Sequence, residues 1–195
     1  MEFNRKNRRR RYFSKYLFII FFLFGKINMV STLKKKIIVL TIILILLDQI
    51  TKLLVTLSIN LNTGISLIPS FFSLVYVQNT GAAWGMFSSG TIILALLSVI
   101  FLAFFVKYII DRKDMDNFEV VISSMLIGGI VGNLIDRLVR GYVVDFFSFK
   151  IFSYNFPIFN VADCFIVISI ILLLFKMYFL DRKKKVVNLD DSEGK

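Results

Sequence analysis

Four long apolar segments constrain this 195-residue chain more than any other feature of its sequence. They run roughly over residues 37–57, 91–110, 118–139 and 161–180. Each is close to the about 20 helical residues that cross the hydrocarbon core of a bilayer. The hydrophobic fraction is 57%, whereas a soluble domain has roughly 45–50%. The sequence therefore predicts a membrane all-α protein, a bundle of four transmembrane helices.

The segment between the first two spans, residues 58–90, has a different character. It contains no Lys, Arg, Asp or Glu, and it includes the β-prone run Phe71–Val77 among glycines and a proline. Such a run bounded by turn residues is typical of strands. Trp84 and the neighbouring phenylalanines suit a membrane–water interface. We therefore predict a small β-rich element at the outer membrane face.

The distribution of positive charge predicts how the helices are oriented. Residues 1–36 hold eleven Lys and Arg, and more follow in the 107–117 loop and in the tail after Leu174. Because loops rich in Lys and Arg stay on the cytoplasmic side, we expect both termini and this loop to be cytoplasmic. The 58–90 and 140–160 loops then face outward. The net charge of +11 is explained by these flanks and indicates no nucleic-acid partner.

The chain divides unevenly into domains. Residues 1–28 combine basic residues with a short apolar run and lie before the first span. We interpret this part as a basic, dispensable extension. Residues 29–195 are expected to form a single integral-membrane domain whose tail is solvated.

The residue types that are missing restrict the chemistry. The chain has no histidine and one cysteine, Cys164, so His-based triads, Cys-rich metal sites and intrachain disulfides are excluded. We expect neither a metal nor another cofactor. Cys164 has no histidine to activate it and is interpreted as an ordinary helix residue. Carboxylates, amides and a few Lys and Arg side chains remain.

Polar and charged side chains in the apolar segments agree in depth. Charges within spans are costly and usually functional. With the orientation above, side chains from distant parts of the sequence meet near the outer membrane face. These are Asp48, Lys52, Asn133, Asp136, Arg137, Asp145, Asn160 and Asp163.

Several of these side chains also have a structural explanation. Asp48 and Lys52 form an i,i+4 pair that could neutralise itself, and Asp136 with Arg137 could anchor a helix end at the interface. Asn160 and Asp163 have the spacing of a helix-capping pair. In the same way, Gly128 and Gly132 favour close helix packing.

Asp145 is the hardest of the set to explain structurally. It stands among apolar neighbours in Tyr142-Val-Val-Asp-Phe-Phe147, with no basic residue within four positions. Two neighbouring carboxyl groups that share a proton can act as base and acid in turn. Without histidine or a reactive thiol, Asp145 and Asp163 are the candidate catalytic pair.

Five segments then resemble the lipoprotein signal peptidase (signal peptidase II) family, in that family's order, over nearly all of residues 33–180. They are Asp48-Gln-Ile-Thr-Lys52, Asn79-Thr-Gly-Ala-Ala-Trp-Gly85, Gly128-Gly-Ile-Val-Gly-Asn-Leu-Ile-Asp-Arg137, Gly141-Tyr-Val-Val-Asp-Phe146 and Phe159-Asn-Val-Ala-Asp163. One departure is that Cys164 stands where the family commonly has Ser.

The resemblance implies a monomeric, multi-pass aspartyl endopeptidase of the bacterial cytoplasmic membrane. It implies substrates that are diacylglyceryl-modified prolipoproteins, cut just before the lipidated cysteine, with membrane lipids as further partners. It assigns catalysis to Asp145 and Asp163 and substrate contact to Asn79, Asn133, Arg137 and Asn160. Asp48, Lys52 and Asp136 match positions associated with shaping the site.

Two alternatives remain at this stage. A small transporter or proton-relay subunit could use Asp48, Asp136 and Asp163 to carry ions, but its carboxylates would be expected near the midplane. A structural membrane anchor is the second. The clustering of carboxylates toward one face favours the peptidase.

Overall fold

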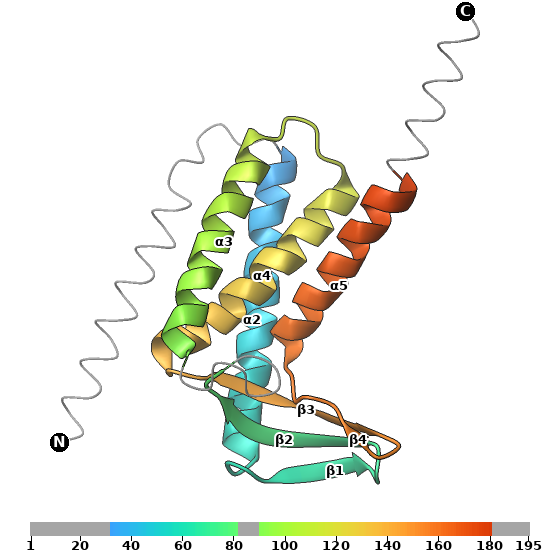
Figure 1. Ribbon diagram of the computed structural model, residues 1–195. Helices are drawn as coiled ribbons and strands as arrows, with labels where there is room; N and C mark the ends of the chain where they lie inside the picture. Colours follow the sequence, from blue (N-terminus) through green and yellow to red (C-terminus); the bar gives the residue numbers. More distant parts are fainter. Residues whose placement is uncertain (1–31, 82–89, 181–195) are drawn as a thin grey trace, which may run out of the picture.

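The computed structural model describes residues 32–81 and 90–180, and its main body is four long helices (Figure 1). They are α2 (Thr32–Ser58), α3 (Thr91–Asp111), α4 (Asn117–Val139) and α5 (Val161–Phe175), the last continued by the short π-helix η2 (Lys176–Leu180). Each is long and apolar enough to cross a membrane. The helices match the four expected spans, although α2 begins earlier than expected, at Thr32. The extension 1–28 and Trp84 lie outside the described residues.

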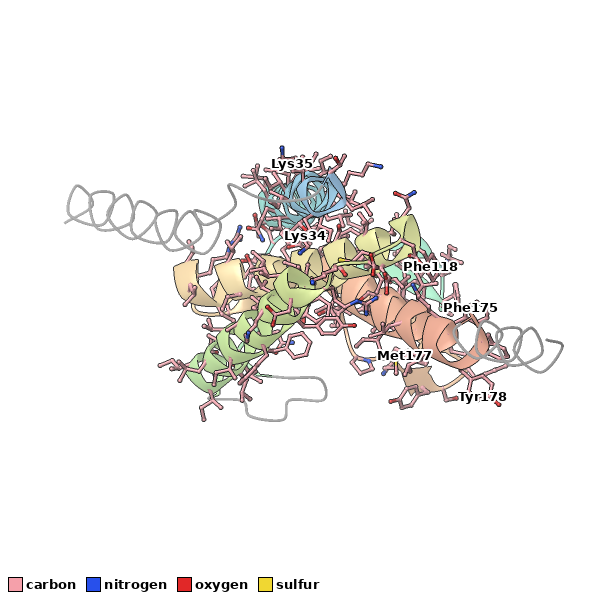
Figure 2. All side chains as sticks on the ribbon, turned by 90° about the horizontal axis from the view of Figure 1, so that it is seen from above. Lys34, Lys35, Phe118, Phe175, Met177 and Tyr178 are labelled. Carbon is pink, nitrogen blue, oxygen red and sulfur yellow. The ribbon has the colours of Figure 1, made fainter. Side chains whose placement is uncertain are left out.

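Helix α4 is the centre of the bundle. Seen from above, it lies between α2 on one side and α3 and α5 on the other (Figure 2). Glycines allow the close approach. A Cβ at Gly128 would lie 3.1 Å from Leu44 Cβ on α2, and one at Gly129 would lie 2.5 Å from the Ala162 carbonyl oxygen on α5. The helix-packing explanation of Gly128 is thereby confirmed.

Helices α4 and α5 each begin at a reciprocal capping pair. Asp116 caps α4 with Glu119 as its partner, and Asn160 caps α5 with Asp163. In such a box each side chain accepts a hydrogen bond from the backbone N–H of the other residue, which satisfies two donors that the helix leaves open. The capping explanation of Asn160 and Asp163 is therefore correct, and it fixes where α5 starts.

A four-stranded antiparallel sheet lies across one end of the bundle (Figure 1). Its strands, in spatial as well as chain order, are β1 (Gly64–Ile68), β2 (Phe72–Asn79), β3 (Val143–Ile151) and β4 (Tyr154–Asn155). The expected β element in 58–90 supplies β1 and β2. The strands β3 and β4 lie in 140–160, for which the sequence predicts only an outward-facing loop.

The sheet is attached to the bundle through the last turn of α2 and Ile59, the residue directly after it. Val55 and Ile59 pack against Tyr76 of β2 and against Val144 and Phe146 of β3. All five side chains are buried. Helix α2 thus extends beyond the other helices and supports the sheet beside the end of the bundle (Figure 1).

The opposite end of the bundle holds a second set of ion pairs. Lys176, which is 6% exposed, contacts Asp116 at 2.6 Å and Glu119 at 3.2 Å. Arg112, at the end of α3, contacts the same Oε1 of Glu119 at 2.9 Å. These contacts join η2, which continues α5, and the end of α3 to the start of α4, far from the sheet.

Candidate active site

Asp145 is a buried carboxyl group on β3, 2% exposed. The side-chain amide of Asn79 donates to its Oδ2 at 2.7 Å from the neighbouring strand β2. The side-chain amide of Asn160 donates to its Oδ1 at 2.6 Å. Asn79 is itself held by the backbone N–H of Gly81, which donates to Asn79 Oδ1 at 2.9 Å. The pairing of β2 with β3 therefore positions the amide that holds Asp145.

Asp163 lies in the first turn of α5 and is half-buried. Its Oδ2 accepts the backbone N–H of Asn160 at 3.0 Å, and its Oδ1 accepts the side-chain amide of Asn133 at 2.7 Å. Asn160 thus contacts both carboxyl groups, Asp145 through its side chain and Asp163 through the capping box. The two candidate catalytic residues meet where the sheet joins α5.

A fully buried cation lies directly behind this pair. Lys52 Nζ is 2.9 Å from Asp48 Oδ2, 3.0 Å from Asp136 Oδ2 and 2.9 Å from Asn133 Oδ1. Lys52, Asp48 and Asp136 are all 0% exposed. A buried charge is tolerated only where it is paired and hydrogen-bonded, and here one ammonium faces two carboxylates and an amide oxygen. The simple i,i+4 pair is present, but it is part of a larger network.

The two buried carboxylates also hold the backbone next to the candidate catalytic residues. Asp48 Oδ1 accepts the N–H of Ala162 at 3.0 Å, one position before Asp163. Asp136 Oδ2 accepts the N–H of Val144 at 3.2 Å, one position before Asp145. Each carboxylate therefore ties the segment that carries one of the two residues to the charged network on α2 and α4.

Arg137 lies at the edge of this network, directly after Asp136 in the sequence. It is half-buried, and its guanidinium donates to the backbone oxygen of Asn133 at 3.5 Å. Among the described residues no carboxylate lies within ion-pair distance of it. Its planar fork of donors is thus not occupied by an internal carboxylate.

The electrostatic surroundings of Asp145 favour its protonated form. Burial, and then the nearby Asp163 carboxylate, raise the pKa of Asp145 from its usual value to about 7. The hydrogen bonds from Asn79 and Asn160 act in the opposite direction, because they favour the charged form. At neutral pH Asp145 is therefore poised between carboxyl and carboxylate.

Two residues of the network were not singled out from the sequence. Gln49 donates to Asp48 Oδ2 at 3.1 Å and to the Gly132 backbone oxygen at 3.2 Å. Arg140 lies 3.3 Å from Asp136 Oδ1. Gln49 could have been found as a polar residue within a span and next to Asp48. All the other site residues expected from the sequence lie within this one region, and Cys164 is half-buried beside it.

The described residues contain no group of three or more His, Cys, Asp or Glu side chains that could hold a metal ion. The carboxylates of the site are instead occupied by Lys52, by asparagine amides and by backbone N–H groups. The arrangement is one of two adjacent carboxyl groups with preorganised donors around them. That arrangement can exchange protons with a water molecule and a carbonyl group.

Comparison with known proteins gives consistent results. A family model described as signal peptidase (SPase) II matches residues 40–179. The lipoprotein signal peptidase of Staphylococcus carnosus is 38% identical over 75% of this chain and 92% of its own length. That of Symbiobacterium thermophilum is 39% identical over 75% of this chain and 96% of its own length.

Solved structures agree with the sequence relatives. One of a bacterial membrane enzyme superposes with a TM-score of 0.67 at 33% identity, covering 72% of this chain and 86% of that chain. A second, also of a bacterial membrane enzyme, gives 0.66 at 33% identity and covers 73% and 92%. The family model spans well over half of the chain, and the four-helix fold with its small sheet is shared. On these grounds the chain belongs to the signal peptidase II family of membrane peptidases.

Proposed function

We propose that this chain is an aspartic endopeptidase that removes the signal peptide from diacylglyceryl-modified prolipoproteins, cutting before the lipidated cysteine. The relatives in Staphylococcus carnosus and Symbiobacterium thermophilum are lipoprotein signal peptidases. The observation that carries the aspartic mechanism is the junction at Asn160, whose side chain and backbone contact Asp145 and Asp163 at the same time.

In the proposed reaction the two carboxyl groups divide the proton transfers. Asp145, with its pKa raised to about 7, is the group that carries the proton. Asp163 as carboxylate takes a proton from a water molecule, whose oxygen attacks the peptide carbonyl carbon. Asp145 donates its proton to the carbonyl oxygen. As the resulting tetrahedral species collapses, the C–N bond breaks and the proton held by Asp163 passes to the leaving nitrogen. At the same time one hydroxyl of the tetrahedral species returns its proton to Asp145, which re-forms the carbonyl group and restores both carboxyl groups to their starting states.

The amides and the guanidinium around the pair have separate proposed roles. Arg137 has no carboxylate within ion-pair distance among the described residues, so its donors are suited to bind carbonyl oxygens of an extended substrate. Asn133 donates from its side-chain amide to Asp163, and we propose that it contacts the substrate together with Arg137. Asn79 and Asn160 hold Asp145, and we propose that they also contact the substrate backbone. Asp48, Lys52 and Asp136 shape the site from behind.

The proposed setting is the bacterial cytoplasmic membrane. The Lys and Arg residues near the start of α2 and in the loop between α3 and α4 favour a cytoplasmic location for both termini and for that loop. The sheet end then faces outward, where the cut bond of a lipid-anchored substrate lies. We propose that residues 29–195 act as a single domain and as a monomer among membrane lipids, and that residues 1–28 are dispensable.

Ion transport is not favoured as the function. A transporter is expected to place its binding groups near the bilayer midplane. Within the described helices, Asp48, Asp136 and Asp163 instead gather at the sheet end, where they are hydrogen-bonded into one network. Membership of a peptidase family points the same way.

The test is substitution of each carboxyl by its amide, Asp145→Asn and Asp163→Asn, assayed on a purified lipid-modified prolipoprotein. Loss of a positioned acid or base typically lowers the rate about 10²–10⁴-fold, and we expect at least that from either variant. Asp111→Asn, at an exposed ion pair with Lys107 at the other end of the bundle, is the matched control. Wild-type turnover by either site variant would remove that residue from the catalytic pair.

A further inference from the structure

The sheet has an unusually uncharged surface. Between Lys52 and Lys107 the sequence contains no Lys, Arg, Asp or Glu, and Lys150 is the one charged residue between Asp145 and Asp163. All five residues of the edge strand β1 are exposed, and its apolar side chains Ile65, Leu67 and Ile68 are each half exposed. Soluble monomers rarely present apolar patches of this kind to water.

The most exposed apolar residue of the sheet lies at its tip. Phe152, in the turn between β3 and β4, is 96% exposed. Its φ of +53° lies in the left-handed region, which is costly for a bulky side chain. Nearby rings pack on one another, as Tyr154 and Phe156 do at 5.1 Å, but within the described residues Phe152 has no ring partner. The fold thus directs the Phe152 side chain outward, and no ring packing among the described residues compensates for its strained backbone.

The location of this tip brings it close to lipid. The β3–β4 hairpin projects sideways past the end of α5 that is nearest the sheet (Figure 1). The outer surface of α5 is apolar and exposed, with Val167 at 55%, and Ile171 and Leu174 each at 59%. In a membrane-spanning bundle that surface faces acyl chains. The hairpin therefore lies beside the sheet end of a helix whose outer surface faces lipid.

We propose that the β3–β4 hairpin is a membrane anchor, in which the Phe152 ring enters the leaflet on the sheet side. Aromatic rings favour this boundary, and long basic side chains extend from it toward the phosphate groups. Lys150 is exposed, and it pairs with Asn155 in the register next to the tip. The partner is the phospholipid leaflet itself. The anchor sets the depth of the sheet and therefore of Asp145, which β3 also carries. The proposal of a membrane anchor does not depend on the proposed catalytic mechanism.

Spin-label accessibility tests this anchor directly. The full chain with Cys164→Ser receives a nitroxide at Phe152→Cys and is reconstituted into vesicles of phosphatidylethanolamine and phosphatidylglycerol. Ile171→Cys, on the lipid-facing side of α5, and Lys113→Cys, in the exposed loop between α3 and α4, are the matched lipid and water references. We expect the label at Phe152 to behave like the label at Ile171, with a higher collision rate with oxygen than with a water-soluble nickel complex.

Two results for the label at Phe152 would overturn the proposal. If the collision rates of the label at Phe152 resemble those of the label at Lys113, the tip lies in water. If the Phe152 label shows spin–spin broadening and low collision rates with both reagents, the tip lies against a second copy of the chain. A second site guards against a local effect of the cysteine. With the label at Ser153→Cys, adding Phe152→Asp is expected to move it toward the water reference. An unchanged label at Ser153 would show that Phe152 is not the anchoring side chain.

Discussion

Lys52 Nζ lies 2.9 Å from Asn133 Oδ1, and this contact determines which way the Asn133 amide points. With its oxygen toward the buried ammonium, its nitrogen is directed at Asp163, to which it donates at 2.7 Å. The cation at the back of the site therefore orients a donor at the front. The same amide oxygen also accepts from Asn160 at 3.2 Å, which links the orientation to the second carboxyl group.

Removing this cation is expected to unfold the network. Lys52→Met leaves Asp48 and Asp136 buried without their counter-charge, and breaking such a buried pair costs about 3–5 kcal/mol. We expect a large drop in the thermal unfolding midpoint in detergent, measured by labelling of Cys164 with a thiol-reactive dye. The control is Lys107→Met at an exposed pair, where the loss is below about 1 kcal/mol. Equal midpoints for the two variants would contradict this account.

The pH dependence of cleavage follows from Asp145. Because its pKa is raised to about 7, its carboxyl is protonated below that pH and loses the proton above it. If Asp145 donates that proton, the rate falls as the pH rises through about 7. Asn79→Ala removes a hydrogen bond that lowers this pKa, so the alkaline limb should move to higher pH.

The control for the pH experiment is the neighbouring residue on β2. Gln78 donates to the Tyr76 hydroxyl at 3.1 Å and not to Asp145. Gln78→Ala should therefore leave the alkaline limb in place, as read from rates on lipid-modified substrate across the pH range. A shift of the limb to lower pH in Asn79→Ala would reverse the sign and refute the assignment.

The close approach of Gly132 to Asp48 gives a third prediction. A Cβ at Gly132 would lie 2.5 Å from Asp48 Oδ2, so Gly132→Ala must displace the carboxylate that contacts Lys52 and the Ala162 N–H. We expect lower cleavage activity and a lower unfolding midpoint. At Gly128 the added Cβ would lie 3.1 Å from Leu44 Cβ and 3.6 Å from the Thr41 backbone oxygen, and it would touch no group of the charged network, so Gly128→Ala should cost less on both measures. The opposite order would argue against a role for Asp48 in positioning.

The other end of the bundle should affect stability and leave catalysis unchanged. Asp116→Ala removes the cap of α4, worth about 1 kcal/mol, together with a partner of the buried Lys176. We expect a lower unfolding midpoint with unchanged turnover per folded molecule below that temperature. Asp114→Ala, two residues earlier and exposed, is the matched control. A fall in turnover at full folding would connect this end to the site, contrary to the structure.

Much of this architecture could be predicted because it depends on local signals. The length of the apolar runs predicts the helices, and a carboxylate in a span such as Asp48 stands out in any sequence. The strand β3 was missed for a physical reason. Its ladder partners are Phe72 to Asn79, more than sixty positions away, and such pairing leaves little periodic signal in a strand with both faces partly covered.

The detailed connections of the site could not be predicted for a similar reason. That Asp48 and Asp136 accept the N–H groups before Asp163 and Asp145 depends on the packing of α2, α4 and the sheet in three dimensions. A residue such as Asn160 can cap a helix and hold a carboxyl at once, and the sequence presents these as alternatives. Only the geometry shows that they are the same arrangement.

Helix α2 carries both the buried cation and the support of the sheet on one stripe of its surface. Lys52, Val55 and Ile59 follow at intervals of three and four. Ile59 comes directly after the end of α2, and its N–H still donates to the Val55 carbonyl oxygen at 2.9 Å, so the network contacts and the sheet contacts share a helical phase. Asp163 belongs to the bundle and Asp145 belongs to the sheet. Helix α2 contacts both, so its length between the two sets of contacts fixes the distance between these two halves of the site. Inserting a full helical turn between Lys52 and Val55 would displace the sheet by about 5.4 Å along α2 relative to the bundle. Inserting a single residue there would rotate the sheet by about 100° around the helix. The separation of the two carboxyl groups is therefore encoded in a residue count on a helix that contains neither of them.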